Sequence, residues 1–207
     1  GTEPDQKFPA GTAWTLRDVK RTLAAASPRA GLEGSLYAGL ERVTEHLVAR
    51  EWRRDDGAMV RVSRLLVDAN WGSSTDVVYQ FCRETKHAGT VMPSHGRYVG
   101  ASSVPFSDYK RRRGERVGLN WCIPTVSGKR AVRHVTFDTN FWKSFVHARL
   151  AVPHGDPGSL SLFGRDSRAH EVFAAHLTSE YRVKTEGRGR VVDEWKLRLA
   201  GDRKSVV

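Results

Sequence analysis

The sequence of 207 residues is poor in cysteine, with only Cys82 and Cys122, and both lie inside apolar segments. Two cysteines cannot form a disulfide framework or a zinc ribbon, so they are predicted to be reduced thiols in the core. Apolar runs of the roughly 20 residues that cross a bilayer are also missing, and the polar N-terminus lacks the apolar stretch of a signal peptide. We therefore expect no membrane partner.

Several catalytic motifs are missing as well. No G-x-S-x-G elbow is present, which argues against a serine hydrolase of that type. The Gly-Lys-Arg at 128–130 lacks the upstream glycine and the Ser or Thr of a P-loop, so no nucleotide-driven motor is expected in this chain. The eight histidines are scattered without metal-ligand spacing on a helix, and those considered as ligands are expected to be surface or packing residues: His95, His134 and His147.

What the chain has in excess is positive charge. Lys and Arg total 34 against 23 Asp and Glu, giving a net charge of +11 and a pI near 10.1. This balance favours a polyanionic partner such as DNA. Two basic groups are candidates for contacts with the DNA backbone, although charge runs also occur as solvated faces. They are Lys110, Arg111, Arg112 and Arg113 in one segment, and Arg182, Lys184, Arg188 and Arg190 in another.

Apolar periodicity predicts an α/β protein. Helical patterns at 15–27 and 32–54 precede a predicted strand at 62–68, a helix at 74–87 and a strand at 89–93. Strand, helix and strand in this order indicate a crossover unit of a parallel sheet. The remaining expectations are a long basic loop (94–116), two strands (116–124 and 130–138) joined through a hairpin turn at Gly128, helices (139–152 and 167–181), a strand (190–199), a flexible N-terminal segment (1–14) and a disordered tail (200–207).

Two predicted strands end on an acid, Asp68 and Asp138. Carboxylates at the carboxyl ends of neighbouring strands would suit Mg²⁺ or Mn²⁺, which prefer oxygen ligands. Each Asp also fits a turn or the N-cap of the helix that follows it, and spacing alone leaves both interpretations open. Asp76, in the first turn of the next helix, fits a dipole-complementing acid or a supporting residue near a metal.

The segments "RLLVDANWGSSTDVVYQFCR", "VMPSHGR", "VTFDTNFWKSFVHARL" and "YRVKTEGRGRVVDEWKLR" together resemble the C-terminal nuclease region of GpA-type phage terminase large subunits. The resemblance implies an RNase H-like mixed sheet flanked by helices, here with an additional β-hairpin and the long basic loop. It implies Mg²⁺- or Mn²⁺-dependent cleavage of double-stranded DNA during packaging in the bacterial host cytoplasm, alongside a terminase small subunit and a portal. Carried over by position, Asp68 and Asp138 match catalytic and metal-binding acids, and Asp76 matches the acid of the turn-helix segment.

The sequence departs from that family at both ends. An RNase H-like nuclease begins with a three-strand meander carrying an acid, and the family closes with an acidic helix. Neither pattern is found here, so residues 1–207 are expected to be a single but incomplete nuclease-type domain. Enzymatic activity is therefore left open, and a non-catalytic DNA-binding or packaging-assembly module is the alternative.

Overall fold

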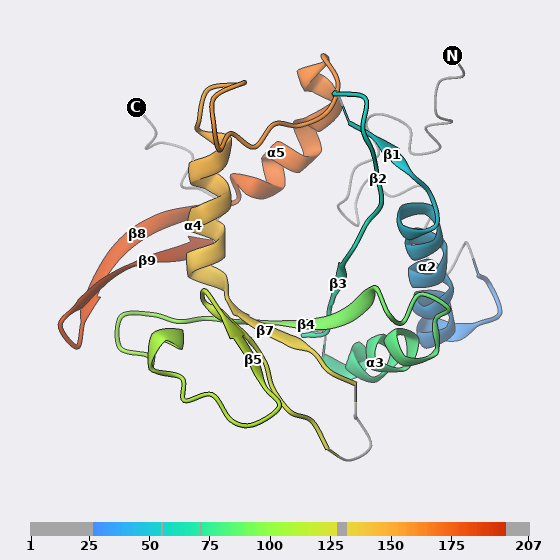
Figure 1. The fold of residues 1–207 in the computed structure, drawn as a ribbon, viewed down its shortest axis with the longest axis horizontal. Helices are drawn as coiled ribbons and strands as arrows, with labels where there is room; N and C mark the ends of the chain where they lie inside the picture. The colour runs from blue at the N-terminus through green and yellow to red at the C-terminus, as the bar shows by residue number, and fades with distance from the viewer. Residues whose placement is uncertain (1–26, 55, 71, 128–131, 198–207) are drawn as a thin grey trace. The chain divides into compact units, whose positions relative to one another are not determined.

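The computed structural model describes residues 27–54, 56–70, 72–127 and 132–197. The predicted helix at 15–27 lies almost entirely outside these ranges, as do the predicted flexible segment 1–14 and tail 200–207. The chain divides into two compact units (Figure 1). We call the described residues of 27–98 and 104–139 the sheet unit, and residues 99–103 and 140–197 the hairpin unit.

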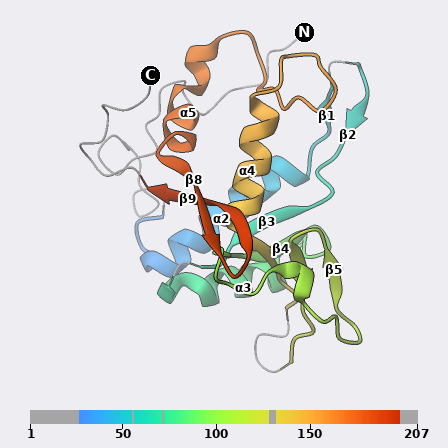
Figure 2. The ribbon, with the colours of Figure 1, turned by 90° about the vertical axis from the view of Figure 1, so that its left-hand side faces the viewer.

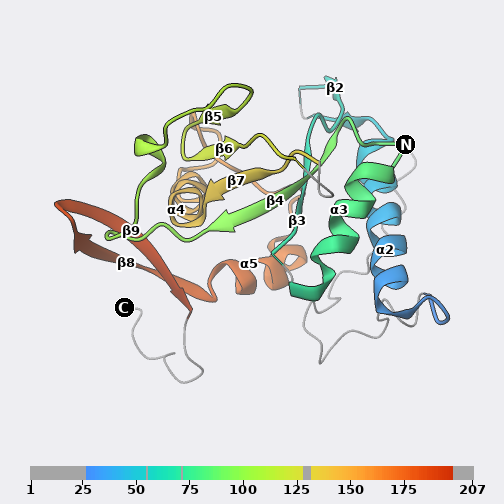
Figure 3. The ribbon, with the colours of Figure 1, turned by 90° about the horizontal axis from the view of Figure 1, so that it is seen from below.

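The sheet unit contains a five-stranded mixed sheet, whose strands have the order β3-β4-β7-β6-β5 (Figure 3). Its strands are β3 (Leu65–Asp68), β4 (Val91–Arg97), β5 (Arg116–Gly118), β6 (Trp121–Ile123) and β7 (Val135–Asp138). Its other elements are α2 (Gly31–Val48), α3 (Thr75–Glu84), the short pair β1 (Trp52–Arg53) and β2 (Met59–Val60), and the 3-10 turns η1 (Gly72–Ser74) and η2 (Phe106–Asp108). The predicted mixed α/β class is confirmed.

The predicted crossover unit is also confirmed, because β3 and β4 pair in parallel from Leu65 with Val91 to Asp68 with Ser94. Helix α3 joins them and lies beside α2 in both Figure 1 and Figure 3. The apolar face of α3 is buried, and Phe81 at its centre is fully inaccessible to solvent. Burial raises the pKa of the neighbouring Cys82 thiol to about 12, so this cysteine is a neutral core residue.

Strand β4 is longer than the sequence indicated. It continues through residues 94–97, so the irregular segment predicted for 94–116 starts instead at Tyr98. The polar stretch Ser94-His95-Gly96-Arg97 has no strand-like periodicity of its own. It is extended because β7 pairs with it in parallel, from Ser94 with Val135 to Arg97 with Asp138.

The segment 116–124, predicted as one strand, is a tight hairpin of β5 and β6. Asn120 sits in its turn at φ 53°, a left-handed conformation that Asn tolerates better than most residues. Gly118 packs so closely on the Trp121 ring that a Cβ there would lie 2.2 Å from a ring carbon. Strand β6 then pairs antiparallel with β7, as expected for the two predicted stretches, but the turn predicted at Gly128 lies outside the described residues.

The hairpin unit carries most of helix α4 (Thr139–Leu150), the turn η3 (Ser167–His170), α5 (Glu171–Leu177), β8 (Glu180–Gly187) and β9 (Arg190–Leu197) (Figure 2). The predicted helix at 167–181 is shorter, because its last residues begin strand β8. Strands β8 and β9 form a hairpin whose turn has positive φ at Arg188 and Gly189, as the type I′ turn of a two-residue hairpin requires. Among the residues that the structure describes, no helix is both long and apolar enough to cross a bilayer.

Candidate functional site

Asp68 is the last residue of β3, and its side chain is exposed at the carboxyl end of the parallel strands. One carboxylate oxygen, Oδ1, accepts the backbone N–H of Asn70 at 3.1 Å. The N-cap position of α3 belongs to Ser74, so Asp68 closes a local turn and does not cap the helix. The sequence left open whether Asp68 binds a metal or serves in a turn or helix cap. The N-cap role is wrong, whereas the role in a turn is confirmed.

The turn that follows Asp68 is held by side-chain hydrogen bonds at both ends. The Thr75 hydroxyl donates to the Ala69 carbonyl at 2.8 Å, which ties the start of α3 to the end of β3. The Asn70 amide donates to the Gly96 carbonyl on β4 at 2.9 Å. Asp76 lies in the first turn of α3 and is exposed, a position where a carboxylate stabilises the positive end of the helix dipole.

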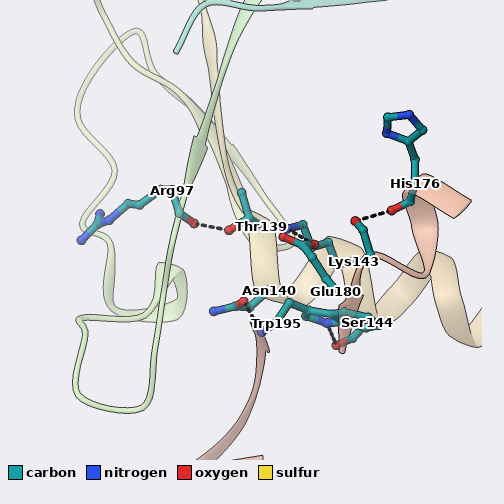
Figure 4. Close-up of polar contacts among 9 residues, drawn as sticks. Arg97, Thr139, Asn140, Lys143, Ser144, His176, Glu180 and Trp195 are labelled. Carbon is teal, nitrogen blue, oxygen red and sulfur yellow. Dashed lines mark hydrogen bonds and ion pairs between the residues drawn. The ribbon is translucent and has the colours of Figure 1, made fainter. Parts of the chain in front are cut away.

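Asp138 is the last residue of β7 and is buried, with only 8% of its surface exposed. Its backbone N–H donates to the Asn120 carbonyl at 2.9 Å, which joins it to the β5–β6 hairpin turn. The next residue, Thr139, starts α4 and donates from its hydroxyl to the Arg97 carbonyl at 3.2 Å (Figure 4). Asp138 is therefore part of a packed strand end.

The sheet register fixes the spacing of these two acids. Asp68 is level with Ser94 of β4, whereas Asp138 is level with Arg97, three residues further along the same strand. With about 3.3 Å per residue and two strand spacings of about 4.8 Å, their Cα atoms are about 14 Å apart. An odd offset also directs side chains to opposite faces of a sheet, so the register separates the two carboxylates.

Among the residues in the described ranges, no group of three or more His, Cys, Asp and Glu side chains is arranged to hold a metal ion. The Asp68 carboxylate could hold a hard cation, since it is exposed and its Oδ1 is oriented by the Asn70 N–H. Mg²⁺ often takes only one or two protein carboxylates and fills its remaining positions with water and substrate phosphate oxygens. Asp68 therefore suits a site completed by substrate.

The first basic group lies on an ordered turn built around Glu115, which is only 4% exposed. The Glu115 carboxylate accepts the Arg112 backbone N–H at 2.8 Å and the Tyr109 hydroxyl at 3.0 Å. These bonds, the Arg112 N–H first among them, hold the pKa of the Glu115 carboxyl below its usual range. Gly114 makes the turn possible with φ 85°. We call residues 110–116 the basic turn.

The cationic side chains of the basic turn are exposed. Arg111 uses its Nε to donate to the Glu115 carbonyl at 3.1 Å, and Arg133 donates to the Gly114 carbonyl at 3.1 Å. The exposed cations Lys110, Arg112 and Arg113 extend from a backbone that is held in place from several sides. This arrangement presents several positive charges within a short distance of each other, as a phosphate backbone requires.

The second predicted basic group belongs to the hairpin unit and divides into two kinds of residue. Lys184 and Arg188 are exposed, and Arg182 pairs with Asp193 at 3.4 Å on the opposite strand. Arg190 is half-buried, and its guanidinium donates to the carbonyls of residues 100 and 101 at 3.2 and 2.8 Å and to that of Ser103. Arg190 thus fastens the segment 99–103 to β9.

The hairpin is joined to α4 by polar contacts that the sequence did not reveal (Figure 4). The Trp195 indole donates to the Ser144 hydroxyl at 2.9 Å, and the Trp195 backbone N–H donates to the Asn140 side chain at 3.0 Å. Lys143 pairs with Glu180 at 2.5 Å. These hydrogen bonds and this ion pair attach the hairpin to α4 inside the hairpin unit, so the residues have a structural role.

One group of residues near Asp68 was also missed, because its members come from three separate segments. His95 on β4 lies between Tyr79 of α3 and Asn70 of the turn, at 2.7 Å from each. His134 packs edge-on against the His95 ring, with ring centroids 4.9 Å apart. Both histidines were predicted from the sequence to be surface or packing residues, because no spacing motif connects them to Asn70.

The chain matches the model of a known protein family. The family model described as terminase large subunit gpA, endonuclease domain, matches residues 37–204. No curated protein and no solved structure matches the chain. The matched range includes Asp68, Asp138 and both basic groups.

Proposed function

Because the chain belongs to the family of terminase large subunit gpA endonuclease domains, we propose that it cleaves double-stranded DNA with the help of a divalent cation at Asp68. The resemblance seen in the sequence is confirmed by this membership, and the family implies DNA and packaging partners in general. We place the cleavage in genome packaging in the host cytoplasm, together with a small terminase subunit and a portal.

A single observation carries the proposal. Asp68 presents an exposed, hydrogen-bonded carboxylate at the carboxyl end of parallel strands, in a protein of net charge +11. In open α/β sheets this edge is where ligands bind, because loops line a crevice beyond the strand ends. An acidic site on an otherwise positive chain suits an enzyme that binds a cation and a polyanion together.

The chemistry assigns separate roles to the protein residues. When bound, Mg²⁺ or Mn²⁺ would activate a water and stabilise the leaving oxygen of the phosphodiester. Asp68 would hold the ion directly, and Asp76 would act as a supporting carboxylate in the first turn of α3. The basic turn, through Lys110, Arg112 and Arg113, would hold the DNA backbone, which positions the duplex without reading its sequence.

Asp138 is proposed as a second catalytic acid from its position in the family motif, apart from the ion at Asp68. The register separates the two Cα atoms and directs the two side chains to opposite faces of the sheet, so Asp138 does not share an ion with Asp68. The RNase H-like class stays part of the proposal. Its support is the mixed sheet with an antiparallel meander β5–β6–β7, although this meander follows the parallel crossover in the chain and does not precede it.

The second candidate function is a non-catalytic DNA-binding or packaging-assembly module. It is favoured by the finding that no three potential ligands come together within the described parts of the chain. In that case the basic surface would bind DNA, and Asp68 would serve only to close its turn.

A plasmid-nicking assay with Mn²⁺ separates the two functions. We expect Asp68→Asn to reduce nicking by about a hundredfold or more, equivalent to ~2.7 kcal/mol in activation free energy. Asp56→Asn is the matched control, because Asp56 is an exposed acid of the same unit that pairs with Arg54 at 3.0 Å. DNA binding by the wild type without any metal-dependent nicking would establish the non-catalytic function instead.

A further inference from the structure

A chain of hydrogen bonds runs from the core of the sheet unit to the exposed carboxylate of Asp68. The Tyr79 hydroxyl lies 2.7 Å from Nε2 of His95, and Nδ1 of His95 lies 2.7 Å from Oδ1 of Asn70. The backbone N–H of Asn70 then donates to Asp68 Oδ1 at 3.1 Å. Three of these four residues were not predicted to belong to the site.

The Gly96 carbonyl determines which groups in this series of hydrogen bonds donate and which accept. The Gly96 carbonyl can only accept, so the Asn70 group facing it is the amide nitrogen, at 2.9 Å. The other end of the Asn70 amide is then an oxygen, which requires His95 to donate from Nδ1. In the neutral imidazole Nε2 is consequently the acceptor, and it receives the Tyr79 hydroxyl proton.

The inner end of this chain is anchored by packing. Tyr79 is 6% exposed and belongs to the same apolar cluster as Phe81 and Val91. The His134 ring lies edge-on to both aromatic partners, 4.9 Å from His95 and 6.1 Å from Tyr79 between ring centroids. A buried hydroxyl and a packed imidazole have few alternative positions, so they restrict Asn70 in turn.

We propose that Tyr79, His95 and Asn70 are positioning residues that orient Asp68 for a divalent cation. This inference rests on the proposed function, because it takes Asp68 as a metal ligand. With Oδ1 fixed by the Asn70 N–H, the carboxylate presents its other oxygen in a defined direction. Residues that hold a metal ligand by hydrogen bonds in this way typically contribute 10- to 100-fold to metal affinity.

Two substitutions at His95 separate the positioning role from simple packing. His95→Asn retains a donor nitrogen at the Nδ1 position and loses the contact with Tyr79. His95→Gln retains a polar group at the Nε2 position and loses the donor to Asn70. We therefore expect His95→Gln to weaken Mn²⁺ binding about tenfold or more, and His95→Asn to weaken it by less than about threefold.

Mn²⁺ binding is measured on the 207-residue chain by paramagnetic broadening of backbone amide signals near Asp68, with calorimetric titration for the affinity. These readouts do not depend on DNA cleavage. His87→Gln is the matched control, since His87, in the turn after α3, pairs with Glu45 of α2 at 2.9 Å. Thermal unfolding of each variant verifies that the fold is retained.

The outcomes distinguish this inference from the proposed function. If the wild type shows no Mn²⁺-dependent broadening near Asp68, or if Asp68→Asn still shows it, the metal site itself is refuted. If the wild type binds Mn²⁺ through Asp68 and His95→Gln binds it equally well, only the positioning role is refuted. Equal weakening by His95→Gln and His95→Asn would also overturn it, because loss of packing alone would explain that result.

Discussion

The arginines predicted to contact DNA differ in how the structure uses them, and this difference predicts opposite behaviour on substitution. Arg112 and Arg113 project from the basic turn with exposed side chains. Arg190 is half-buried and donates to carbonyls of the segment 99–103, those of Gly100 and Ala101 among them. A double substitution, Arg112→Gln with Arg113→Gln, should weaken DNA binding, whereas Arg190→Gln should mainly destabilise the hairpin unit.

The magnitudes follow from these two environments. Each phosphate contact contributes about 0.9 to the slope of log affinity against log salt, so losing two contacts reduces the slope by about 1.8. Between 50 and 200 mM salt, the advantage of the wild type over the double variant should therefore shrink about 12-fold. Arg190→Gln should leave the slope unchanged and cost about 1–3 kcal/mol of stability, since buried carbonyl oxygens lose their donor.

Fluorescence anisotropy with a labelled duplex at four salt concentrations measures the slope, and urea denaturation followed by circular dichroism measures stability. An unchanged slope in the double variant at Arg112 and Arg113 would refute the assignment of the basic turn to DNA. A reduced slope in Arg190→Gln without loss of stability would refute the structural role of Arg190.

Two further predictions concern the sheet unit. Burial, and then the neighbouring His95, lower the pKa of His134 below its ordinary 6.5, so the unfolded chain binds the proton more readily. The stability that neutral His134 contributes is therefore present above pH 6.5 and is lost as the pH falls from there through the folded pKa. Urea denaturation at pH 7.5 and at pH 5.5 should show a smaller loss of unfolding free energy for His134→Gln than for the wild type. At Gly96 an added Cβ would lie 2.6 Å from the Thr139 methyl carbon, so Gly96→Ala should cost about 1–3 kcal/mol of unfolding free energy. Gly89→Ala, where nothing lies within 4 Å, should be nearly neutral in the same titration, and equal effects at both glycines would contradict the steric argument.

Local patterns were sufficient to predict the crossover of β3, α3 and β4. Leu65 to Val67 form an apolar run that ends at an acid and a turn, and the segment after Thr75 has a helical apolar periodicity that reflects the burial of one face. The hairpin at 116–123 was missed because its turn, Leu119-Asn120, interrupts an apolar run without a strong turn signal. The helix after Asp166 was predicted too long because the sequence does not mark where β8 takes over from α5.

In the candidate site, too, some features could be predicted from local sequence, and others depend on pairing between distant segments. The position of Asp68 at a strand end could be predicted from the sequence, because it depends on neighbouring residues alone. The extension of β4 through Ser94 to Arg97 could not, since a polar stretch becomes a strand only when β7, about 40 residues later, supplies its hydrogen-bond partners. The spacing of Asp68 and Asp138 depends on that same pairing.

The sequence by itself determined the basic character of the chain, its mixed α/β class, the family motifs and an acid at the end of a strand. These features depend on composition and on contacts between residues close in the chain. Only the tertiary structure decided that Arg190 is used inside the hairpin unit, and that Tyr79, His95 and Asn70 form one connected chain behind Asp68. Both depend on residues distant in sequence, whose hydrogen bonds exist only once the sheet and the hairpin have formed.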